Sequence, residues 1–177
     1  MIKWVHKPTR MQRGRHSFCV KQGFDDFNSY CGVEFSAFDP LSRNITIDHP
    51  CDFNIKTVSV ASCWWGSYSP DGIGPDYEYF NGKFKRIGLN PINGIWIGGN
   101  QVTKDLVKAR RMILIPAYYQ LCTKVLNANY DWYRVVLKMK ASPIQFELYD
   151  EADNTNIEDI QRISYAWLLV KYIDLLI

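Results

Sequence analysis

A proline inside a helical stretch is the feature that most constrains the fold of this chain. Residues 103–115 place apolar side chains at helical spacing, and Thr103 is a residue type that caps helix N-termini. Pro116 lacks the N–H that an α-helix needs, and its ring crowds the preceding turn. The sequence therefore predicts that this helix kinks or ends near Ile115 and that a second helical piece covers residues 117–125.

Length and composition predict one domain with a substantial core, because the chain has 177 residues and 47% hydrophobic side chains. Apolar periodicity and capping residues predict its elements. These are a strand at 17–20, strands at 44–48 and 52–56 that pair as a hairpin, a helix at 60–66 capped by Ser59, a helix at 131–140, a strand at 143–149, an acidic loop at 150–159 and a terminal helix at 165–177 capped by Ser164.

The net charge of +3 conceals alternating blocks of charge. Residues 1–24 carry a net +6, residues 25–82 a net −7, residues 83–140 a net +9 and residues 141–177 a net −5. The first block lacks a sustained apolar period and predicts a basic N-terminal arm at 1–24, followed by a domain at 25–177. The basic blocks fit an ordinary solvated face, and they also fit a surface that binds phosphate or nucleic acid.

The cysteines and histidines argue against several classes of protein. Five cysteines, an odd number without a close pair or a histidine at metal-ligand spacing, favour reduced thiols in a cytoplasmic protein. No metal or other cofactor is expected, and the three histidines lie outside any motif that would pair them with a nucleophile.

Membrane association is not expected either. Lys3, His6 and Lys7 interrupt any early apolar run, so the sequence predicts no signal peptide. The apolar segment 165–177 is shorter than the roughly 20 residues that cross a bilayer.

A glycine-flanked basic segment gives a weak signal for a nucleotide site. Lys83, Lys85 and Arg86 lie between Gly82 and Gly88, where backbone amides can approach a pyrophosphate. The N-terminus of the helix that follows Thr103 would add its positive dipole end. The glycine spacing matches neither of the common phosphate-binding motifs.

Three motifs, in order, carry a resemblance to a known family. Residues 35–38 read Phe-Ser-Ala-Phe, residues 45–48 read Ile-Thr-Ile-Asp, and residues 59–66 read Ser-Val-Ala-Ser-Cys-Trp-Trp-Gly. Together with Ala109-Arg110-Arg111 and the residues around Pro116, they resemble the NADAR (NAD- and ADP-ribose-associated) family over about residues 31–175. The resemblance implies a compact, mostly helical α+β domain that cleaves N-glycosidic bonds to ribose, including the bond between ADP-ribose and guanine.

The chain departs from the family pattern at two positions. Ala61 stands where the resemblance implies a catalytic acid, and Ser67 and Tyr68 stand where it implies a lysine. Cleavage passes through an oxocarbenium-like centre that needs a carboxylate. Either another acid has taken over, or the domain binds its ligand without turning it over. The candidate acids are Glu34, Asp71, Asp150 and Asp159.

The candidate site residues follow from these arguments. The catalytic candidates are Asp150 and Glu34, and the ligand-binding candidates are Phe35, Ser36, Ser59, Trp64, Trp65, Lys83, Lys85, Arg86, Arg110 and Asn154. Indole rings would stack on a base or sugar, and the cations would hold phosphates. Core packing for Trp64, turn capping for Asp150 and a buried pair for Arg110 are the alternatives.

Two functional hypotheses result. The first is an N-glycosidase that acts on ADP-ribosyl or N-ribosyl nucleotides and removes ADP-ribose from guanine in DNA, as a phage counter-defence in the host cytoplasm. The second is a catalytically degenerate binding protein that sequesters a nucleotide ligand, inhibits a partner protein or grips nucleic acid through its basic face. The sequence leaves the oligomeric state open.

Overall fold

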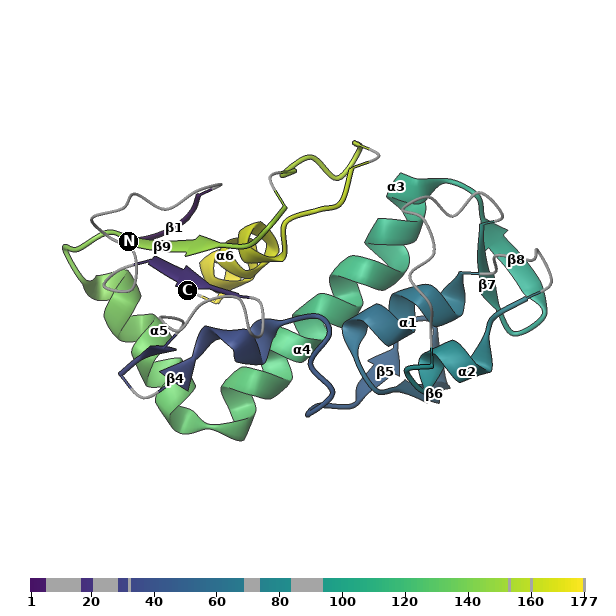
Figure 1. Cartoon of the computed structure of the whole chain (residues 1–177), viewed down its shortest axis with the longest axis horizontal. Helices are drawn as coiled ribbons and strands as arrows, with labels where there is room; N and C mark the ends of the chain where they lie inside the picture. The colour runs from purple at the N-terminus through teal and green to yellow at the C-terminus, as the bar shows by residue number, and fades with distance from the viewer. Residues whose placement is uncertain are drawn as a thin grey trace. The chain divides into compact units, whose positions relative to one another are not determined.

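The computed structural model describes residues 1–5, 17–20, 29–31, 33–68, 74–83, 94–152, 154–159 and 161–176 (Figure 1). These residues form helices and small sheets of two or three strands, so the predicted α+β class is confirmed. The chain divides into two compact units. Unit 1 comprises residues 1–39, 122–155 and 163–177, and unit 2 comprises residues 40–121 and 156–162.

Unit 1 contains a three-stranded sheet in the order β1 (Ile2–Trp4), β9 (Phe146–Tyr149) and β2 (Ser17–Cys19), with both pairs parallel. All four residues of the central strand β9 are buried. The predicted strands at 17–20 and 143–149 are thus confirmed, with shorter bounds. Within the segment predicted as an arm, residues 2–4 and 17–19 are strands of this sheet.

An aromatic cluster packs beside this sheet. β3 (Ser29–Tyr30) and β4 (Val33–Glu34) form a short antiparallel pair that leads into the 3₁₀ helix η1 (Phe35–Phe38). The Phe35 ring stacks on Phe18 with centroids 4.9 Å apart and meets Trp132 edge-on at 5.1 Å. Trp132 lies on α5 (Tyr130–Ala141), which begins at the Asn129 cap and confirms the predicted basic helix. The last helix, α6 (Tyr165–Leu175), begins at Ser164 as predicted.

Unit 2 begins with the predicted hairpin. β5 (Ile47–His49) and β6 (Asp52–Thr57) pair antiparallel across a two-residue turn. α1 (Val60–Ser67) follows, with Ser59 as its N-cap as predicted, because the Ser59 hydroxyl accepts from the N–H of Ser62 at 3.0 Å. The short helix α2 (Tyr77–Phe80) and a second hairpin of β7 (Ile95–Ile97) and β8 (Asn100–Thr103) were not predicted.

The helix at the proline begins later than predicted. Thr103 ends β8, and Asp105 caps α3 (Leu106–Ala109) by accepting from the N–H groups of Val107 and Lys108 at 2.8 and 3.2 Å. Both Thr and Asp are capping residues, so pattern alone could not separate them. The Thr103 hydroxyl instead accepts from the N–H of Asp105 at 3.0 Å.

The chain stays helical through Pro116. A π-helical turn, η2 (Arg110–Leu114), separates α3 from α4 (Ile115–Ala128), and the N–H of Ile115 bonds to the carbonyl of Arg110. An α-helix would join the carbonyl of Met112 to the N–H that Pro116 lacks, and the Cys51 thiol lies 3.7 Å from that carbonyl. The predicted break therefore takes the form of a π turn before the proline, where a helix can absorb the missing bond.

No helix in the described part of the chain has the length and apolarity of a membrane span.

Candidate functional site

The predicted site residues divide between the two units. Unit 1 contains Glu34, Phe35, Ser36, Asp150 and Asn154, and unit 2 contains Ser59, Trp64, Trp65, Lys83 and Arg110. Lys85, Arg86 and the candidate acid Asp71 lie outside the described residues.

Asp150, the first catalytic candidate, is bound into the fold through both carboxylate oxygens. Oδ1 accepts from the Ser164 hydroxyl at 2.9 Å and from the N–H of Ala152 at 3.0 Å. Oδ2 accepts from the N–H groups of Tyr165 and Ala166 at 2.6 and 3.1 Å. Four donors match the acceptor capacity of a carboxylate, so this geometry supports the turn-capping alternative and opposes a catalytic role.

The electrostatics of Asp150 agree with that assignment. The residue is 6% exposed, and burial raises the pKa of its carboxyl above its usual value, although the four hydrogen bonds oppose that shift. The carboxylate lies at the N-terminus of α6, where the helix dipole stabilises negative charge. The Asp150 carboxylate therefore stabilises the first turn of α6 and closes the loop that precedes this helix.

Arg110 is likewise committed to backbone. Its guanidinium is buried in η2, where Nη1 donates to the carbonyls of Ile157, at 2.6 Å, and Asp159, and Nη2 donates to the carbonyl of Gln161 at 2.5 Å. These bonds hold the loop formed by residues 156–162 within unit 2. The structure therefore gives Arg110 a loop-fixing role in place of the predicted contact with phosphate.

The remaining candidates of unit 1 differ in burial and in hydrogen bonding. Phe35 is fully buried in the aromatic cluster and offers no face to a ligand. Ser36 is buried, and its hydroxyl lies 3.4 Å from Oε2 of Glu34, which is long for such a bond. Glu34 is exposed at the end of β4. Asn154 is buried, and its carbonyl accepts from the N–H of Ser164 at 2.9 Å, so it belongs to the same loop closure as Asp150.

The start of α1, where Ala61 lies, is closed by hydrogen bonds within the chain. Ser59 occupies the cap, the N–H of Ala61 donates to the carbonyl of Pro40 at 3.0 Å, and the N–H of Cys63 returns to the Ser59 carbonyl at 3.0 Å. Ala61 is 7% exposed and Trp64 is 8% exposed. Ser59 and Trp64 are therefore structural in this arrangement, as the core-packing alternative for Trp64 predicts.

Trp65 and Lys83 remain accessible in unit 2. Trp65 is half-buried on α1 and meets Tyr68 edge-on with ring centroids 6.1 Å apart, and Lys83 is exposed after α2. Gly66 lets the two helices approach, because a Cβ there would lie 2.2 Å from the ring of Phe80. α2 packs against α1 at this contact, and Lys83 follows α2 in the chain.

Residues 84–93, the middle of the predicted phosphate cradle, lie outside the described residues, and the described parts on either side have structural roles. Gly82 and Gly94 both have positive φ, and a Cβ on Gly94 would meet the Thr103 carbonyl at 2.5 Å. Gly94 therefore serves the close pairing of the hairpin. The N-terminus of α3 is occupied by the Asp105 carboxylate, which would repel an anion there.

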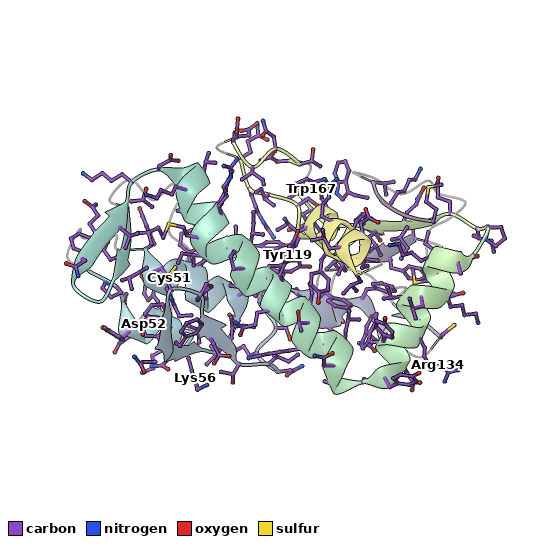
Figure 2. The ribbon with its side chains drawn as sticks, turned by 180° about the vertical axis from the view of Figure 1, so that it is seen from behind. Cys51, Asp52, Lys56, Tyr119, Arg134 and Trp167 are labelled. Carbon is purple, nitrogen blue, oxygen red and sulfur yellow. The ribbon has the colours of Figure 1, made fainter. Side chains whose placement is uncertain are left out.

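A buried histidine–serine pair was missed by the sequence analysis. The N–H of Cys51 donates to Nδ1 of His49 at 3.2 Å, so the ring proton belongs on Nε2, which lies 2.7 Å from the Ser67 hydroxyl. That hydroxyl in turn donates to the carbonyl of Cys63 at 2.7 Å. Figure 2 marks Cys51 at the turn between β5 and β6.

The direction of these bonds decides what the pair can do. His49 donates to Ser67 and takes no proton from it, and burial lowers the pKa of the imidazole, so the ring is neutral. The serine is therefore not activated as a nucleophile. Because 18 residues separate the two side chains in sequence, no local pattern could have revealed their contact.

Within the described residues, no group of three or more His, Cys, Asp or Glu side chains could hold a metal ion. Comparison with protein-family models, with curated proteins and with solved structures finds no match.

Proposed function

We propose that this protein is a NADAR-like binding protein for an ADP-ribosyl or related nucleotide ligand, and that it does not cleave the ligand. The observation that carries the proposal is the hydrogen bonding of Asp150, the first candidate to replace the family's acid. Its two oxygens are occupied by four donors of its own chain.

Cleavage of an N-glycosidic bond needs a carboxylate that can approach the sugar or activate water. Asp150 would have to give up bonds to the start of α6 to do either. Asp159 caps its own turn, because its Oδ1 accepts from the N–H of Gln161 at 3.0 Å. Ala61, at the position implied by the resemblance, has no acid to offer.

Binding needs less than catalysis, and unit 2 retains groups suited to it. Trp65 offers an indole face for a base or ribose, and Lys83 opens the basic segment that continues to Lys85 and Arg86. Trp65 lies on α1 and Lys83 follows α2, and these two helices pack on each other at Gly66 and Phe80. An aromatic residue and a basic segment within one unit suit a nucleotide, whose base can stack and whose phosphates are negatively charged.

Two measurements test this function on the full chain. Calorimetric titration with ADP-ribose should detect binding, and incubation with a guanine-ADP-ribosylated oligonucleotide should release no free ADP-ribose detectable by mass spectrometry. Trp65→Ala should weaken ADP-ribose binding about tenfold, the magnitude of one lost stacking contact. Tyr77→Ala, which removes a 59% exposed aromatic ring from the same unit, is the matched control.

The N-glycosidase remains the alternative because Glu34 is an exposed carboxylate. Release of ADP-ribose that is abolished by Glu34→Gln and retained by Asp150→Asn would replace the binding proposal with that enzyme. If ADP-ribose neither binds nor shifts the unfolding midpoint of the protein, both the binding proposal and the N-glycosidase alternative are refuted.

A further inference from the structure

The outward face of α5 in unit 1 combines exposed aromatic rings with exposed cations. Tyr130 is 73% exposed, Tyr133 is 38% exposed and the Arg134 side chain is 68% exposed. Lys138 is exposed one turn further along. The opposite face, with Trp132, Val136 and Met139, is buried against unit 1.

These four side chains are neighbours on the helix surface. Tyr130, Arg134 and Lys138 follow one another at intervals of four residues, which places them in a row about 6 Å apart along the axis. Tyr133 lies beside this row, one turn after Tyr130. Figure 2 shows Arg134 on the outer side of the helix.

The two cations are available for a ligand. Arg134 lies 3.7 Å from Asp131, but both side chains are about two-thirds exposed, and such surface pairs contribute little. Lys140, in contrast, donates to the carbonyl of Ile173 at 3.2 Å and lies 3.8 Å from Asp174, so it is bound to α6. The positive charge that α5 presents outward is therefore that of Arg134 and Lys138.

We propose that this face of α5 binds single-stranded nucleic acid, with Tyr130 and Tyr133 stacking on bases and Arg134 and Lys138 contacting phosphates. Aromatic rings interleaved with cations are the recurring means by which proteins hold single strands without reading their sequence. A duplex shields the faces of its bases, so the tyrosines favour a single strand. This surface lies in unit 1, whereas the proposed ADP-ribosyl site lies in unit 2, so the two proposals stand or fall separately.

The first test measures the role of the rings. Fluorescence anisotropy with a labelled oligodeoxythymidylate and a labelled hairpin duplex should show tighter binding of the single strand. The double variant Tyr130→Ala/Tyr133→Ala should bind the single strand at least about tenfold more weakly. The variant Tyr130→Phe/Tyr133→Phe should keep most of the affinity because it keeps the rings. Equal binding of duplex and single strand, or no effect of the alanine pair, would overturn the proposal.

The second test separates a specific face from general positive charge. Arg134→Ala/Lys138→Ala and Lys104→Ala/Lys108→Ala each remove two exposed cations, the first from unit 1 and the second from unit 2. Only the first pair should weaken binding, and it should lower the slope of log affinity against log salt by about 1.4. Equal losses in the two pairs would show nonspecific attraction and would refute the assignment to α5. So would binding to vesicles of anionic lipid without binding to the oligonucleotide. Circular dichroism and unfolding midpoints confirm that each variant is folded.

Discussion

Asp150 in unit 1 and Arg110 in unit 2 are buried charged side chains that bind opposite ends of the peptide group. Asp150 accepts from the Ser164 hydroxyl and two backbone N–H groups at the start of α6, and from the N–H of Ala152. Arg110 donates to three backbone carbonyls in the loop at 156–162. From the sequence, Asp150 was proposed as a catalytic group and Arg110 as a phosphate-binding group. In the structure, each forms hydrogen bonds that hold the backbone of a loop.

The difference lies in what each side chain would leave behind if it were removed. The N–H groups of Tyr165 and Ala166 belong to the first turn of a helix, and Ala166 is fully buried. The carbonyls that Arg110 binds belong to Ile157, Asp159 and Gln161, which are half-buried or exposed, so water can reach that loop more easily. The Asp150 contacts should therefore be the harder to replace.

The largest expected effect is that of Asp150→Ala. The substitution leaves buried helix N–H groups without acceptors and removes a favourable charge from the helix N-terminus, so the free energy of unfolding should fall by about 4 kcal/mol. Urea denaturation followed by circular dichroism measures the change. Asp131→Ala, an exposed acid near the start of α5, should change it by less than about 0.5 kcal/mol. A loss below about 1 kcal/mol for Asp150→Ala would reopen a catalytic role for this carboxylate.

Arg110→Met tests the other half of the comparison. The apolar side chain fills similar space but donates to none of the three carbonyls, and partial hydration of the loop should limit the loss to about 2 kcal/mol. Arg111→Met provides the control, because Arg111 is 62% exposed and only 3.7 Å from the exposed Glu158. If Arg110→Met proved more destabilising than Asp150→Ala, the argument from loop hydration would be wrong.

The sequence predicts the role of a residue well only when its hydrogen-bond partners lie close to it along the chain. The caps Ser59 and Ser164 and the hairpin at 47–57 were predicted because each is set by neighbours within a few residues. The partners of Arg110 lie 47 to 51 residues away, which no local pattern encodes.

Asp150 illustrates the same limit at shorter range. Ser164 lies 14 residues beyond it, and the intervening loop is closed by the bond between these two side chains and by a parallel bridge between Asn154 and Ile163. The sequence named turn capping as an alternative for Asp150 but could not name the turn. The roles of the candidate site residues were harder to predict than the helices and strands. A buried polar residue has the same sequence signature whether it binds the backbone or a ligand.

His49 extends the comparison to a buried group that stays neutral. Burial lowers the pKa of its imidazole below the usual 6.5, so the folded protein binds fewer protons than the unfolded chain. The stability that depends on the neutral ring is present above pH 6.5 and is lost as the pH falls through the lowered pKa. The free energy of unfolding should therefore decrease from pH 7 to pH 5 more steeply for the native protein than for His49→Gln.

The native protein and the variant share every other titrating group, so the difference between their two pH profiles isolates His49. Parallel profiles would mean that the imidazole is as accessible to protons in the folded protein as in the unfolded chain. The hydrogen bond from Cys51 to Nδ1 would then have to be broken in solution.

The smallest expected effect concerns the π turn that carries Arg110. Pro116 leaves the carbonyl of Met112 without its usual partner, and the Cys51 thiol lies 3.7 Å from it. Because a thiol is a weak donor, Cys51→Ala should lower the free energy of unfolding by only about 0.5 kcal/mol. In the background of Pro116→Ala, which restores an N–H, the same change should have a smaller effect.

A double-mutant cycle over Cys51 and Pro116 measures this coupling. Additive effects would show that the thiol does not compensate for the proline. The π turn would then have to be attributed to the pull of Arg110 on its loop, and Arg110→Met should itself restore α-helical hydrogen bonding between residues 110 and 114. Hydrogen exchange of the Leu114 and Ile115 amides would report that change directly, because in the native turn the N–H of Ile115 bonds to the carbonyl of Arg110.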